Sequence, residues 1–112
     1  MNLHSLTKDY LTAWNKRNKD AFEQLFAEDI ALKDWEIEVD GKASVIGANA
    51  NIWEAVPDIH ILIMHIGVCE EQNKTYAEII VTSTQENLNL RVIDVIKFNN
   101  DGKIKSVDAY KQ

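Results

Sequence analysis

Residues 88–98 read LNLRVIDVIKF, and this stretch decides the fold because its even positions form an apolar face. Asp94 alone interrupts that face, so we expect a strand with one side turned toward a core. Similar runs precede and follow it, separated by polar segments of hairpin length and by the turn signal Asn99–Gly102. The prediction is a meander of antiparallel strands over Ile59–Cys69, Thr75–Ser83, Leu88–Phe98 and Ile104–Tyr110.

The N-terminal part of the chain has helical periodicity instead. From Leu3 to Trp14, apolar side chains recur at steps of three and four, which predicts a helix with Ser5 as its N-cap. This helix ends within Asn15–Asn18. A second helix, with Ala21, Phe22, Leu25 and Phe26 as its apolar stripe and Glu28-Asp29 as its end, follows so closely that the two should pack together.

A broken strand and a third helix lead into the meander. Ile30–Val39 alternates but is interrupted near Asp34, and Asp40-Gly41 is a turn signal. Ala48–Val56 predicts a short helix. Helices followed by consecutive strands indicate an α+β fold with an antiparallel sheet, and helices on one face of a curved sheet can enclose a pocket.

Length and charge restrict the classes of function. The chain has 112 residues, which suits a single domain over residues 1–112. Its formal net charge is −6 without a visible basic patch, so we expect neither nucleic acid nor a membrane surface as a partner. A lone cysteine, Cys69, excludes an intrachain disulfide and fits a reducing, cytoplasmic compartment. Neither a signal peptide nor a membrane-spanning run is visible.

Asp94 breaks the pattern of its own strand. A charged carboxylate on a core face is unfavourable unless it finds a partner or stays protonated. Two interpretations stand. Asp94 is either a structural aspartate that caps a backbone group or pairs with a lysine, or a functional carboxyl group in a pocket.

Two further residues gain interest beside Asp94. Asp34 shares parity with Ile30 and Leu32, although an aspartate at a strand-end bulge or turn is the simpler interpretation on pattern alone. Tyr10 lies on the core face of the first helix, where most tyrosines serve packing. A phenol and a protonated carboxyl can both donate to one oxygen while an ionised carboxylate moves a proton, and these are the parts that stabilise an enolate.

The sequence shows no metal or phosphate motif. His60 and His65 have opposite parity in one strand, so they cannot both face a pocket. No spacing of His, Asp or Glu resembles a metal site, and no glycine-rich phosphate loop is present. We therefore expect neither a metal nor a cofactor.

Two segments carry a family resemblance. Tyr10–Ile30, continuing to Asp34, resembles the opening of the nuclear transport factor 2-like superfamily, which includes ketosteroid isomerases and SnoaL-like proteins. Arg91–Ile104, continuing to Tyr110, resembles the C-terminal half of the isomerases. The resemblance implies a cystatin-like fold, in which a curved antiparallel sheet wraps around N-terminal helices to form a cone with an apolar pocket.

The resemblance also implies roles for three residues. Asp34 falls on the family's base, and Tyr10 and Asp94 fall on the two donors of its oxyanion hole. The implied reaction is an allylic isomerisation, by intramolecular proton transfer, of a small hydrophobic carbonyl compound. The residues expected to line the pocket are Trp14, Phe26, Trp53, Leu90, Val92, Val107, Ala109 and Lys111.

Some features depart from the isomerase pattern. The third helix offers no supporting tyrosine, and Trp35 rather than proline follows Asp34. Lys111 at the pocket mouth would suit a smaller or acidic ligand better than a steroid. The alternative function is therefore a non-catalytic module of the SnoaL-like type, for small-molecule binding or dimerisation. With either function we expect a homodimer through the outer sheet face, with Ile93 and Val95 supplying apolar contact.

Overall fold

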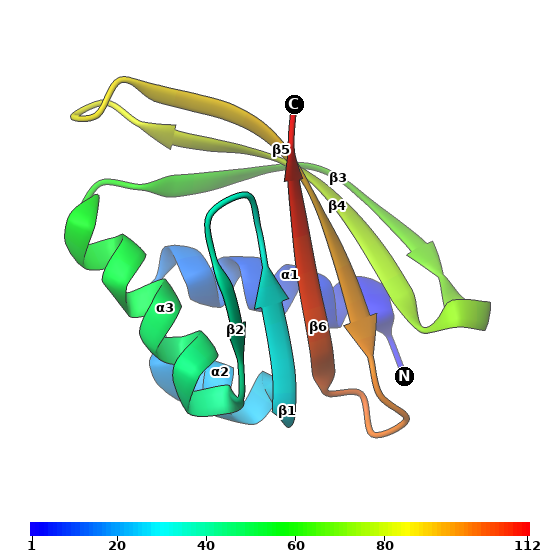
Figure 1. Ribbon diagram of the computed structural model, residues 1–112. Coiled ribbons are helices and arrows are strands. Elements are labelled where there is room, and N and C mark those ends of the chain that lie inside the picture. The colour runs from blue at the N-terminus through cyan, green and yellow to red at the C-terminus, as the bar shows by residue number, and fades with distance from the viewer.

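The computed structural model describes residues 1–112 and has the predicted α+β architecture (Figure 1). Three helices lie on one side of a curved six-stranded sheet, and a 3-10 turn over Glu70–Gln72 links two of the strands. The helices are α1 (Leu3–Asn15), α2 (Lys19–Leu25) and α3 (Lys42–Ala55). The strands are β1 (Phe26–Lys33), β2 (Glu38–Asp40), β3 (His60–Cys69), β4 (Lys74–Ser83), β5 (Leu88–Phe98) and β6 (Ile104–Lys111).

The sheet has the order β2-β1-β6-β5-β4-β3. The predicted meander of four antiparallel strands is confirmed in β3 to β6. One pair differs, because β1 runs parallel to β6. The chain passes through β2, α3 and the other strands before it returns beside β1, and such a long crossover permits a parallel pair.

The boundaries near the N-terminus differ from the prediction. Asn2 rather than Ser5 caps α1, since the Asn2 side chain accepts a hydrogen bond from the Ser5 backbone N–H at 3.0 Å. Helix α2 ends at Leu25 rather than at Glu28-Asp29, and Phe26 opens β1. Its apolar side chain fits both the helical stripe before it and the strand alternation after it, so the pattern could not separate the two.

Helix α3 begins six residues before the predicted start, at Lys42 rather than Ala48. Its buried side chains, Val45, Ile46, Asn49 and Trp53, follow helical spacing. The predicted range contained Asn49 and Trp53 but left out Val45 and Ile46, which precede Ala48. At 14 residues α3 is the longest helix, and no helix of the structure is long and apolar enough to cross a membrane.

The core lies between the helices and the concave face of the sheet, and aromatic rings fill its centre. Phe22 stacks on Phe26 with ring centres 4.7 Å apart, and Tyr10 packs against both rings. Trp53 stacks on Phe22 and meets Trp14 edge to face. These contacts join all three helices to β1 and hold Tyr10 and Trp14 in place on α1.

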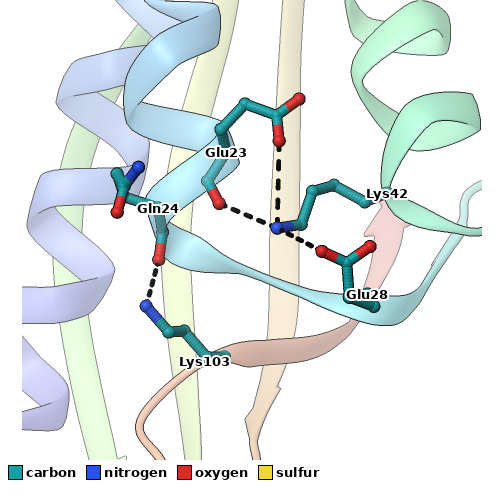
Figure 2. A network of polar contacts seen from close by, with 5 residues as sticks. All are labelled: Glu23, Gln24, Glu28, Lys42 and Lys103. Carbon is teal, nitrogen blue, oxygen red and sulfur yellow. Dashed lines mark hydrogen bonds and ion pairs between the residues drawn. The ribbon is translucent and has the colours of Figure 1, made fainter.

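A network of polar contacts joins α2, β1, α3 and the β5–β6 turn (Figure 2), and we call this part of the molecule the Lys42 end. Lys42 Nζ lies 3.0 Å from Glu28 Oε1 and 3.8 Å from Glu23 Oε2, and it donates to the Glu23 carbonyl at 2.9 Å. Lys103 Nζ donates to the Gln24 carbonyl at 2.6 Å. These contacts satisfy carbonyls in the last turn of α2, which have no partner within the helix.

Candidate functional site

A cavity of about 380 Å³ opens between the helices and the sheet, away from the Lys42 end. Of its 21 lining residues 17 are hydrophobic. They come from α1, the last part of β1 and its turn, the second half of α3, and strands β3 to β6. The four polar residues of the lining are Asp34, Glu36, Asn49 and Asp94. An apolar cavity with a few polar groups is typical of a small-molecule site.

Asp94 faces this cavity from the middle of β5, as its parity predicted. It stands opposite Ala77 on β4 and Ala109 on β6, whose small side chains leave room beside the carboxyl group. The residue is 6% exposed, and neither a hydrogen bond nor an ion pair within the protein engages its side chain. Burial, with a smaller contribution from the charge of Asp34, raises the pKa of Asp94 to about 7.

Tyr10 lines the same cavity from α1. Its ring is fixed by Phe22 and Phe26, while no hydrogen bond within the protein uses its hydroxyl group. Burial, followed by the charge of Asp94, raises the pKa of this phenol. Tyr10 therefore keeps its proton and can donate it in a hydrogen bond to a ligand.

Asp34 forms a turn and also lines the cavity. Its Oδ1 accepts hydrogen bonds from the backbone N–H groups of Glu36 and Ile37 at 2.7 and 2.6 Å. Its own backbone N–H donates to the Ile37 carbonyl at 2.8 Å. Oδ1 thus has the structural role in a turn that the simpler interpretation of the sequence predicted. Oδ2 makes no hydrogen bond within the protein.

Asn49 is a polar lining residue that the sequence analysis missed. It is 3% exposed, and its Oδ1 accepts a hydrogen bond from Trp14 Nε1 at 3.0 Å. Its Nδ2 donates to the Val45 carbonyl at 3.0 Å, which leaves one amide hydrogen without a partner. A signal was present in the sequence, since Asn49 shares a helical face with Val45, Ile46 and Trp53.

The structure places five of the eight expected lining residues on the cavity wall, namely Trp14, Leu90, Val92, Val107 and Ala109. The other three lie outside this lining. Phe26 and Trp53 lie in the aromatic core, where both stack on Phe22. The Lys111 ammonium lies 5.2 Å from the centre of the Trp35 ring and outside the lining.

The other lining residues that the sequence analysis did not expect are Glu36 and apolar residues from β1 and its turn, α3, β3, β4 and β5. No three His, Cys, Asp or Glu side chains lie close enough to hold a metal ion.

The conical sheet, the helices on its concave side and the cavity between them define a class of protein. Several solved structures share this fold. One is a proposed isomerase of the SnoaL-like family from Agrobacterium tumefaciens, with a TM-score of 0.85, 19% identity, and coverage of 100% of this chain and 99% of that chain. Another is a protein of unknown function with a cystatin-like fold from Methylobium petroleophilum, with a TM-score of 0.87, 14% identity, and coverage of 97% and 74%.

A third is a proposed ketosteroid isomerase from Kribbella flavida, with a TM-score of 0.83, 16% identity, and coverage of 98% and 77%. At these identities the likeness concerns the fold alone. Residues 7–107 match the SnoaL-like domain family, so the chain belongs to that family. A search of curated proteins finds no match to the chain.

Proposed function

We propose that the protein is a cofactor-independent isomerase that shifts a double bond into conjugation with the carbonyl group of a small hydrophobic compound. One observation carries the proposal. The Tyr10 hydroxyl and the Asp94 carboxyl, neither of them bonded within the protein, open into the same apolar cavity as the Asp34 carboxylate. Two donors beside a base are what proton transfer next to a carbonyl requires.

In the proposed reaction, Asp34 Oδ2 takes a proton from the carbon between the carbonyl group and the double bond. The electrons of the broken C–H bond move toward the carbonyl oxygen and form a dienolate. Tyr10 and protonated Asp94 donate hydrogen bonds to this oxygen as its charge grows. Asp34 then returns the proton to the far end of the conjugated system, so the net change is isomerisation and the base is restored.

The geometry supports each role separately. Two backbone N–H groups hold Asp34 Oδ1, which orients the free Oδ2 without using it. Hydrophobic residues make up most of the cavity wall, and electrostatic stabilisation of a developing charge is stronger in such surroundings. Two similar structures carry the names of proposed isomerases, which supports the same class of reaction.

The experiment is a turnover assay with a β,γ-unsaturated cyclic ketone, whose conjugated isomer absorbs more strongly in the ultraviolet. We expect Asp34→Asn to lower the rate by at least ~10²-fold, because an amide cannot act as the base while its oxygen still accepts both turn hydrogen bonds. Tyr10→Phe should lose on the order of 10²-fold as well. The matched control is Asp29→Asn, which changes an exposed aspartate of β1, the strand that ends just before Asp34, and should keep the rate.

The alternative is a binding module without turnover. Its support is that Asp34 already has a structural duty in the turn. If the wild-type protein binds the ketone but converts none of it, or if Asp34→Asn keeps full activity, the isomerase proposal fails and the module remains.

A further inference from the structure

The acids of the cavity have no counter-charge. Asp34, Glu36 and Asp94 belong to the lining, whereas no lysine, arginine or histidine does. All ion pairs of the protein use other acids. A cluster of acids occurs on many surfaces, but Asp94 is 94% buried from solvent, being 6% exposed, and it opens into the cavity without a partner. This arrangement indicates a ligand site that lacks a positive group.

Lys111 does not supply that group. Its ammonium lies on the ring of Trp35 at 5.2 Å, while Trp35 itself lines the cavity and is 40% exposed. A cation on an indole ring is attracted by the negative charge of the ring face. Lys111 occupies the ring of Trp35, so the carboxylate of Glu36 is the charged group that stays unpaired at the mouth of the cavity, which these two exposed lining residues form.

The three acids are not equally free to pair with a cation. One oxygen of Asp34 is held by two backbone N–H groups, and burial keeps Asp94 largely protonated below pH 7. The Glu36 side chain makes neither a hydrogen bond nor an ion pair within the protein, although its backbone N–H bonds to Asp34. Glu36 is thus the carboxylate that a positive group would meet on entering.

We propose that the ligand of this cavity is an apolar compound bearing a protonated amine, that Glu36 receives the amine at the mouth, and that anionic compounds are excluded. The proposal rests on the proposed function in taking the same cavity as the ligand site. It adds a second group to the ligand, apart from the carbonyl that Tyr10 and Asp94 would hold. An ammonium about 5 Å from one carboxylate gains a factor on the order of 100 in affinity at an effective dielectric constant of 20, and solvent at the mouth reduces this gain.

The test compares three probes with one apolar body, namely naphthylethylamine, naphthylethanol and naphthylacetate, by titration calorimetry at pH 7. We expect the amine to bind about tenfold more tightly than the alcohol and the acid about tenfold more weakly. The proposal is overturned if the acid binds as tightly as the alcohol, if the amine gains nothing over the alcohol, or if none of the three binds. Because binding is read without turnover, a failed isomerase assay leaves this result standing, and the reverse also holds.

Two variants locate the effect. Glu36→Gln should lower the ratio of amine to alcohol affinity about threefold or more, and the turn keeps its shape because the Glu36 backbone N–H still bonds to Asp34. The control is Glu78→Gln, which removes the same charge from the outer face of the sheet, where Glu78 pairs with Arg91. An equal loss in both variants would show that net charge rather than Glu36 selects the amine, and would overturn the assignment.

Discussion

At the Lys42 end, carboxylates and carbonyls converge on lysine side chains, whereas at the cavity the carboxylates converge without any cation. Lys42 alone contacts Glu23 and Glu28 and is itself only 14% exposed at its side chain. Asp94 is buried more deeply and has no partner. The first arrangement joins elements and stabilises the fold. In the second, burial of an unpaired carboxyl group lowers the stability of the fold, and the same group is free to bond to a ligand. Neutralising a charge should therefore have opposite consequences for stability at the two places.

The largest expected effect is a gain of stability in Asp94→Asn above neutral pH. The pKa of Asp94 is about 7 in the fold, against 3.8 for an aspartate in water, so between these values the folded state holds a proton that the unfolded state has lost. Stability from this group consequently falls as pH rises from about 4 to 7, by up to about 4 kcal/mol. Urea unfolding of wild type and Asp94→Asn at pH 4, 5.5 and 8 should show the variant gaining on wild type as pH rises.

A pH-independent difference between these two proteins would contradict the buried, unpaired state of Asp94. The same variant separates stability from activity. An amide can still donate a hydrogen bond to the ligand oxygen, so Asp94→Asn should keep part of the isomerase rate, and Asp94→Ala should lose more of it.

The next effect is a loss of stability at the other end. Lys42→Ala removes the donor to the Glu23 carbonyl and the partner of both glutamates, for a loss of about 1–2 kcal/mol. Lys105→Ala, at an exposed position of β6, serves as the control and should stay within about 0.5 kcal/mol of wild type. Denaturant unfolding measures both, and affinity for naphthylethylamine should be unchanged, because the Lys42 end shares no residue with the cavity lining. A change in that affinity would show that the two ends are coupled.

Some of the features behind these contrasts could be predicted from the sequence, and others could not. The alternation of β5 placed Asp94 on the inner face, and period-two patterns also located β3, β4 and β6 within a residue at each end. Such patterns are local, because each side chain's facing depends only on its neighbours in the strand. The acid in an apolar face was therefore readable without any tertiary information.

The remaining features depend on contacts that are distant along the chain. The parallel pairing of β1 with β6 and the Trp14–Asn49 hydrogen bond, 35 positions apart, leave no periodic trace. Phe26 and Trp53 lie in the aromatic core rather than on the cavity wall for a related reason. The apolar pattern indicates that a ring is buried but not whether it contacts a cavity or another ring. Lys111 lies outside the lining because its long side chain turns onto Trp35.

A surface away from both ends carries the expected homodimer, which we propose forms through the outer face of the sheet. Ile93 and Tyr110 are paired across β5 and β6 and are 38% and 61% exposed, and Leu62 and Met64 on β3 add to the exposed apolar side chains. Ile93→Ser should weaken association about tenfold, or roughly 1.4 kcal/mol, in sedimentation at micromolar concentration. Wild-type protein that sediments only as a monomer would contradict the proposal.

The smallest effect concerns Asp58, an acid beside the cavity. Like the glutamates at the Lys42 end, and unlike Asp94, it has partners within the protein. Asp58 accepts from the Ser83 hydroxyl at 2.6 Å and from the backbone N–H groups of Thr84 and Gln85 at 2.9 and 3.1 Å. These bonds, led by that from Ser83, hold the pKa of Asp58 below its usual value. Its contribution to stability is therefore present above the unfolded pKa and is lost as pH falls through the lower folded one, which is the reverse of Asp94.

Because Asp58 is only half-buried and its bonds all lie within one turn, we expect Asp58→Asn to change the local order of the β4–β5 turn rather than global stability. Amide hydrogen exchange should quicken at Thr84 and Gln85 in the variant above pH 4 and match wild type in strong acid, where both side chains are neutral. Faster exchange that spreads to β4 and β5 would mean that this acid stabilises the whole sheet. The contrast between paired and unpaired acids would then not coincide with the two ends of the molecule.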